Sequence, residues 1–169
     1  MLTRHQIQAV EAGVKKLTKT GKTVIDSPTA LAFLKDMLLQ KGSGLRAALY
    51  AGSTDKLNGA QLADLMRVIE GAGYSAFWYP ESRGYESMSL AAYLLSKSTR
   101  LTIGSSIANI YARDPFTAQR AMVSLNNLHA GRFVLGLGVS HIPMVEGLRG
   151  HRYDKPLGAM RAYLDGIHK

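Results

Sequence analysis

Hydrophobic and polar positions along residues 101–140 predict a strand, a helix and a second strand in turn. Leu101, Ile103 and Ile107 form the first apolar run, and Asp114-Pro115 then offers a helix cap followed by a proline suited to a first helical turn. In the helix that follows, apolar residues recur at three- and four-residue steps and predict one buried face: Ala118, Ala121, Met122, Leu125 and Leu128.

Gly131 is placed to end that helix, and a second apolar strand comes directly after it. The residues expected to be buried in this strand are Phe133, Val134, Leu135 and Leu137. The whole segment therefore predicts one βαβ unit of a parallel barrel.

The same periodicities along residues 45–169 predict four strands that alternate with helices. The strands are expected at Leu45–Tyr50, Ser75–Tyr79, Arg100–Ile107 and Arg132–Gly138. The helices are expected near Gly59–Gly71, Ser87–Lys97, Phe116–His129 and Pro156–His168. No fifth strand is expected, and the neighbours Phe77 and Trp78 should face opposite sides of the sheet.

Residues 1–44 carry a different pattern, typical of a helical hairpin. Thr3 and Gln6 form a capping box ahead of an apolar stripe, and a second helix is expected to begin at Ser27-Pro28 and to end near Gly42. We therefore expect a helical extension at 1–44 and an α/β domain at 45–169. The extension could cover an open flank of that domain, mediate dimerisation, or be an accidental addition upstream of a gene fragment.

Composition narrows the function classes. With 46% hydrophobic residues and no apolar run near the ~18 residues of a membrane helix, we expect a cytoplasmic protein without a membrane partner. No cysteine is present and the five histidines lack a metal-binding spacing, so no metal site is expected. The net charge of +9 is spread along the chain, with seven Lys/Arg against three Asp/Glu in residues 1–44 and fourteen against nine in the rest. A solvated basic surface is therefore favoured over a nucleic-acid site.

Three motifs resemble the luciferase-like monooxygenase family: SAFWYPES at 75–82, SSIANIYARDP at 105–115 and HAGRFVLGLGVSH at 129–141. The resemblance spans about residues 45–169 and is greatest to the branch that uses the deazaflavin coenzyme F-420. It implies a TIM-type (β/α)8 barrel, which typically needs about 250 residues. The α/β domain should therefore be the N-terminal half of such a barrel, with four parallel strands and alternating helices.

The resemblance also places candidate chemistry after the strands. Glu81 matches an acidic residue that would orient substrate or move a proton, whereas Ser82 departs from the histidine that follows it in many relatives; a helix-capping or solvated carboxylate is the alternative. Ser106 and Ile107 occupy the position of a bulge with a non-prolyl cis peptide that backs the cofactor ring, unless this strand end is an ordinary trans one. Asn109 would then hydrogen-bond the pyrimidine edge of the ring.

Further residues follow from the same comparison. His141 stands where some deazaflavin dehydrogenases carry a glutamate proton donor, and an imidazole with a pKa near 6.5 can do this work; a surface loop histidine is the alternative. Tyr153 would either line the substrate pocket or pack on the barrel rim. Arg113 is expected in a structural ion pair with Asp114 or another acidic neighbour.

The function implied is an oxidoreductase that transfers hydride between coenzyme F-420, or alternatively FMN, and an unidentified small organic substrate. Barrel phosphate sites are usually built after strands seven and eight, so this chain should bind the cofactor weakly or not at all by itself. Its two open sheet edges predict a homo-oligomer or a complementary half barrel as partner. The alternative is a non-catalytic, truncated or degenerate half barrel that acts in binding or assembly.

Overall fold

The computed structural model describes residues 48–52 and 54–168 of the chain. These residues all belong to one compact unit, Arg46–Lys169. The helical hairpin predicted at 1–44 lies outside the described residues, and the domain boundary expected after residue 44 stays a prediction.

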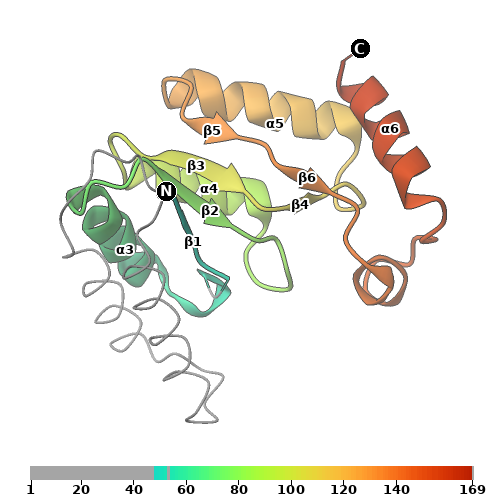
Figure 1. Cartoon of the computed structure of the whole chain (residues 1–169), viewed down its shortest axis with the longest axis horizontal. Helices are drawn as coiled ribbons and strands as arrows, with labels where there is room; N and C mark the ends of the chain where they lie inside the picture. The colour runs from blue at the N-terminus through green and yellow to red at the C-terminus, as the bar shows by residue number, and fades with distance from the viewer. Residues whose placement is uncertain (1–47, 53, 169) are drawn as a thin grey trace, which may run out of the picture. The chain divides into compact units, whose positions relative to one another are not determined.

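Strands and helices alternate along the described chain (Figure 1). The strands are β1 (Ala48–Tyr50), β2 (Ala76–Tyr79), β3 (Thr102–Ser105), β4 (Ala108–Asn109), β5 (Phe133–Val134) and β6 (Leu137–Gly138). The helices are α3 (Gly59–Gly71), α4 (Ser87–Ser96), α5 (Pro115–Leu128) and α6 (Pro156–Ile167), with a 3-10 turn at Thr54–Lys56 and a π-helical turn at Pro143–Gly147. All strand pairs are parallel, in the orders β1-β2-β3-β5 and β4-β6. This confirms the predicted α/β class, with strand–helix alternation as in half of a (β/α)8 barrel.

The sequence pattern did not predict two further short strands: β4 lies beyond the end predicted for the strand at Arg100–Ile107, and the strand predicted at Arg132–Gly138 is divided into β5 and β6. β3 is separated from β4 by Ser106 and Ile107, and β5 from β6 by Leu135 and Gly136. At this break the Ser105 hydroxyl donates to the Gly136 carbonyl oxygen (2.9 Å) and accepts from the Gly136 N–H (3.0 Å). A Cβ atom on Gly136 would lie 2.1 Å from the Ser105 carbonyl oxygen. Hydrogen bonds of the Ser105 side chain and the close contact with Gly136 therefore replace the regular backbone hydrogen bonds between strands at this point.

The four-stranded sheet has one covered and one open face. In-register residues on the covered face are buried: Leu49, Phe77, Ile103 and Phe133. Their neighbours on the other face are Tyr50, Trp78, Gly104 and Val134, of which Tyr50 is 56% and Val134 41% exposed. Phe77 and Trp78 thus face opposite sides, as predicted. The expected burial of Val134 was wrong, because it lies on the open face of an outer strand.

Helix α5 begins as predicted. The Asp114 side chain accepts a hydrogen bond from the Thr117 N–H (2.9 Å), and Pro115 opens the first turn. Ala118 and Leu125 are buried against neighbouring elements, whereas Leu128 is 76% exposed, so the predicted apolar stripe is too long. Only the part of the stripe that meets α6, β5 and α4 is covered. The chain then leaves the helix through left-handed backbone at Ala130 and Gly131, in agreement with the predicted stop at Gly131.

Candidate functional site

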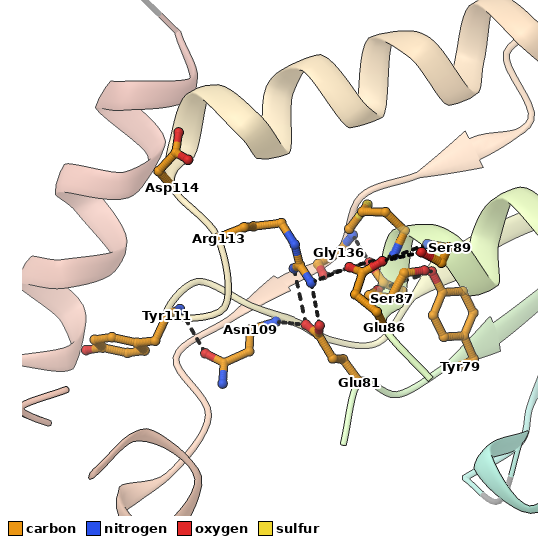
Figure 2. A network of polar contacts seen from close by, with 12 residues as sticks. Tyr79, Glu81, Glu86, Ser87, Ser89, Asn109, Tyr111, Arg113, Asp114 and Gly136 are labelled. Carbon is orange, nitrogen blue, oxygen red and sulfur yellow. Dashed lines mark hydrogen bonds and ion pairs between the residues drawn. The ribbon is translucent and has the colours of Figure 1, made fainter. Parts of the chain in front are cut away.

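A buried ion pair lies at the carboxyl ends of the strands, between Glu81 and Arg113 (Figure 2). Glu81 follows β2 by two residues, and its Oε2 accepts from the Asn109 N–H (2.8 Å) and from Nη1 of Arg113 (3.2 Å). Nη2 of Arg113 donates to the other carboxylate oxygen. The carboxylate of Glu81 is therefore fully engaged, and its predicted role in orienting substrate or moving a proton stays a prediction.

Glu86 joins the same network from the start of α4. Its carboxylate accepts from the N–H groups of Met88 (3.0 Å) and Ser89 (2.8 Å), so it caps the helix, and it also pairs with Arg113 at 2.8 Å. Burial raises the pKa of Glu86, but these hydrogen bonds and the guanidinium outweigh burial and leave the pKa lowered. Glu86 was not predicted as a site residue, although a negative side chain directly before an apolar helix is favourable at the helix N-terminus.

Arg113 forms the structural ion pair that was expected of it, but with Glu81 and Glu86 instead of Asp114. Burial lowers its pKa, and the two carboxylates more than offset this, so the pKa is raised and the guanidinium stays charged. One cation thus serves two anions, while Asp114 is used as the cap of α5.

The Ser106-Ile107 peptide bond is cis, as predicted. The Ser106 N–H donates to the Tyr79 carbonyl oxygen (2.7 Å), and the Ile107 carbonyl oxygen accepts from the Glu81 N–H (3.2 Å). A Cβ on Gly138 would lie 2.5 Å from Cγ1 of Ile107, so β6 approaches the bulge as closely as a glycine permits. The bulge is therefore held from β2 on one side and contacted by β6 on the other.

Asn109 is buried beside this bulge. Its Oδ1 accepts from the Tyr111 N–H (2.9 Å), and its amide nitrogen points away from the ion pair (Figure 2). The contact with Tyr111 fixes the side chain in one orientation, which leaves the amide NH2 group as a directed donor.

His141 lies apart from the Glu81 network. Its side chain is exposed, and its carbonyl oxygen accepts from the N–H groups of Met144 (3.0 Å) and Val145 (3.1 Å) at the π-helical turn. Within the described residues, no hydrogen bond or ion pair joins His141 to Glu81. The structure thus brings together Glu81, Ser106, Ile107 and Asn109, but not His141, and the roles predicted for these residues stay predictions.

Tyr153 packs in the loop that follows. Its hydroxyl donates to the Ser140 carbonyl oxygen (3.1 Å), and its ring lies 6.1 Å from that of Tyr111, centroid to centroid. Of the two alternatives considered for Tyr153, these contacts fit packing on the rim.

A cavity of about 500 Å³ adjoins the ion pair. The loop after β2, the first half of α5 and residues 148–149 surround it, and Glu81, Glu86 and Arg113 form part of its wall. In the part of the chain that the structure describes, no group of acidic or histidine side chains is arranged to hold a metal ion. Among the described helices, none has the length and apolar character needed to cross a membrane.

Parallel strands alternating with helices define an α/β-barrel type of domain, and its buried polar residues lie at the carboxyl ends of the strands, where barrel enzymes place their sites. The family model for luciferase-like monooxygenases matches residues 42–169, and the chain belongs to this family.

Curated relatives agree with this assignment. Over 127 residues the chain is 32% identical to a Mycobacterium tuberculosis protein named as a coenzyme F-420-dependent oxidoreductase, a match that covers 75% of this chain and 37% of the relative. It is also 30% identical over 98 residues to a luciferase-like monooxygenase of Escherichia coli, covering 54% of this chain and 29% of that protein. The chain thus spans less than two fifths of the length of these relatives.

Solved structures show the same fold. The coenzyme F-420-dependent tetrahydromethanopterin reductase of Methanopyrus kandleri superposes with a TM-score of 0.63 at 18% identity, over 75% of this chain and 40% of that one. The oxygenating constituent of 3,6-diketocamphane monooxygenase from Pseudomonas putida, in complex with FMN, has a TM-score of 0.63 at 12% identity, over 75% and 39%.

Proposed function

We propose that this chain forms part of an oxidoreductase that transfers hydride between coenzyme F-420 and a small organic substrate. The observation that carries the proposal is the buried, oriented amide of Asn109 at the carboxyl ends of the strands. The relative named as a coenzyme F-420-dependent oxidoreductase supports F-420 as the cofactor. FMN is the alternative, because one structural neighbour is a complex with FMN.

The residues around Asn109 fit a flat heterocyclic ring. Because Oδ1 is occupied by the Tyr111 N–H, the amide NH2 group is left to donate to a carbonyl oxygen on the pyrimidine edge. Ser106 and Ile107 would back the ring. The bound deazaflavin would supply or accept the hydride, and the protein would position it.

Glu81 and His141 would then act differently. Glu81 binds the Asn109 N–H and Arg113, so its contacts favour a positioning role in addition to the substrate or proton role first predicted. His141 carries an exposed imidazole, a side chain that commonly acts as a general acid, so we propose it as the proton donor to substrate.

Cofactor titration with a matched pair of variants tests the proposal. Asn109→Asp keeps the Oδ1 acceptor for Tyr111 but removes the NH2 donor and places a buried carboxylate opposite the ring oxygen, so it should weaken F-420 or FMN binding by at least about tenfold. Asn127→Asp makes the same charge change at an exposed position of α5 and should leave binding unaltered. Cofactor fluorescence is the readout, with wild-type binding weak in this chain alone. Cofactor binding by the Asn109→Asp variant equal to that of the wild type would refute the contact between Asn109 and the ring. Submicromolar cofactor binding by a proven monomer would refute the expectation that this chain lacks part of the cofactor site.

We further propose that the chain assembles with a second copy or with a complementary half barrel. Outer strands β1 and β5 of the four-stranded sheet carry the exposed Tyr50 and Val134 on its open face, where a partner would cover them. Sedimentation at micromolar concentration should therefore detect species larger than the 18.4 kDa chain. A single compact particle of that mass would rule out self-assembly.

A non-catalytic half barrel is the second candidate. It is favoured by the full engagement of Glu81 with Arg113 and Asn109 and by the separation of His141 from that network. Retained assembly without any saturable binding of F-420 or FMN, in the isolated chain or in the assembled protein, would select this candidate over the enzyme.

A further inference from the structure

The cavity beside the Glu81–Arg113 pair has the size of a small-molecule site. Its volume of about 500 Å³ lies within the roughly 300–1,000 Å³ typical of ligand pockets. Part of its wall is apolar and comes from three separate segments: Met88 in α4, Ala121 in α5 and Leu148 after the π-helical turn. Neither Asn109 nor His141 lines it, so it is distinct from the proposed ring site.

Two cations in this wall, Arg83 and Arg149, form no ion pair with a described residue, and only Arg149 has a buried donor without a partner. Glu81 and Glu86 share the guanidinium of Arg113, and Glu86 is further satisfied by the N–H groups at the start of α4. Arg149 also lines the cavity, and its Nε is buried without a hydrogen-bond partner. Among buried side-chain nitrogen and oxygen atoms of the described residues, only the Tyr111 hydroxyl shares this condition. A buried donor without an acceptor is unfavourable, and an anionic ligand would correct it.

We propose that this cavity binds a small organic monocarboxylate, with the carboxylate on the Arg149 guanidinium and the hydrocarbon part against Met88, Ala121 and Leu148. A guanidinium presents its N–H groups in a fork that matches the two oxygens of a carboxylate. A dianionic phosphate suits the site less well, because Arg83, Arg113 and Arg149 face Glu81 and Glu86 around the same cavity, and the resulting net charge of +1 is balanced by one carboxylate. The apolar wall accounts for an alkyl or aromatic body in place of a simple inorganic anion.

Octanoate is a suitable probe, since it joins one carboxylate to an apolar chain. Calorimetric titration of the full chain at constant ionic strength should show saturable binding of octanoate. Acetate lacks the hydrocarbon and octan-1-ol lacks the charge, so each should bind at least about tenfold more weakly.

Two substitutions on neighbouring residues separate the specific contact from general charge. Arg149→Gln should weaken octanoate binding by about tenfold or more. Arg152→Gln removes the same charge from an exposed residue outside the cavity and should leave the affinity unaltered. Leu148→Ala should weaken octanoate but not acetate, which tests the apolar wall without touching any charge.

Three results would overturn the proposed carboxylate site. The first is an absence of saturable octanoate binding, and the second is an octan-1-ol affinity equal to that for octanoate. The third is wild-type octanoate affinity in an Arg149→Gln variant that circular dichroism shows to be folded. F-420 and FMN titrations on the same variants should be unaffected. Loss of cofactor binding together with octanoate binding would mean that the cavity belongs to the cofactor site, contrary to the proposal.

Discussion

The N–H group of Asn109 donates to Oε2 of Glu81 across 2.8 Å, so the carboxylate that follows β2 holds the backbone of β4 directly. Because Arg113 binds the same carboxylate, Glu81 connects the β2 loop, the strand after the cis-peptide bulge and the segment that leads into α5. The Glu81–Arg113 ion pair therefore holds the backbone of Asn109, the residue whose side-chain amide lies at the strand ends.

Neutralising Glu81 should destabilise the domain. Glu81→Gln keeps an acceptor for the Asn109 N–H but leaves Arg113 with only one anion. Loss of one partner from a buried pair typically costs about 3–5 kcal/mol, and the remaining Glu86 should reduce the cost here to about 2–3 kcal/mol. Urea denaturation measures the change.

Asp64→Asn is the matched control, since Asp64 pairs with Arg67 on the exposed face of α3. Exposed pairs contribute about 0–1 kcal/mol, so this variant should unfold at nearly the wild-type midpoint. Similar losses of unfolding free energy in the two variants would show that the buried Glu81–Arg113 pair stabilises the domain no more than an exposed pair does.

A methyl group at Gly136 should be poorly tolerated. A Cβ there would lie 2.1 Å from the backbone oxygen of Ser105, so Gly136→Ala has to displace backbone beside the bulge, at about 3 kcal/mol. Gly71→Ala is the control, because its Cβ meets nothing within 4 Å at the end of α3 and alanine favours helix. The unfolding midpoint should fall in Gly136→Ala and should stay the same or rise in Gly71→Ala. An unchanged midpoint in Gly136→Ala would contradict the close contact between Gly136 and the Ser105 carbonyl oxygen.

Arg132 ties the end of α4 to the sheet through its guanidinium fork. Nη1 donates to the Leu101 carbonyl oxygen (2.9 Å), and Nη2 donates to the carbonyl oxygens of Leu95 (3.1 Å) and Ser98 (3.2 Å). Lysine cannot reproduce these divergent bonds, so Arg132→Lys should cost about 1–3 kcal/mol. Arg120→Lys, on the exposed face of α5, should have little effect in the same thermal or urea melts.

Acid should destabilise the domain through Glu70 as well as Glu86. The Glu70 carboxylate accepts from the N–H groups of Thr99 (3.0 Å), Arg100 and Leu101 (3.1 Å); burial raises its pKa, but these bonds outweigh burial and lower it. A lowered folded-state pKa means that the unfolded chain binds more protons. The stabilisation is thus complete above the ordinary value of 4.5 and is lost as pH falls through the folded pKa.

Urea midpoints from about pH 7 to about pH 3 should therefore decline below about pH 4.5. In Glu70→Gln this decline should be shallower, since one carboxylate no longer contributes. An identical decline in the variant would show that other groups carry the acid sensitivity.

Local sequence determined the described helices of this domain. Apolar periodicity located all four main helices to within a few residues, and Asp114-Pro115 predicted the start of α5, because caps and periodic stripes depend on neighbours in the chain. The family motifs pointed to the Ser106-Ile107 cis bond in advance. These signals are local, so one sequence was enough to identify them.

Tertiary structure alone decided where side chains found their partners. Glu81 and Glu86 meet Arg113 from about thirty residues away, and the Ser105–Gly136 contact at the break between β5 and β6 joins positions equally distant in sequence. Val134 and Leu128 have the apolar character of core residues, yet both are exposed because no described element covers them. Periodicity identifies which residues could be buried or paired, whereas burial and pairing themselves depend on which distant segments pack against them.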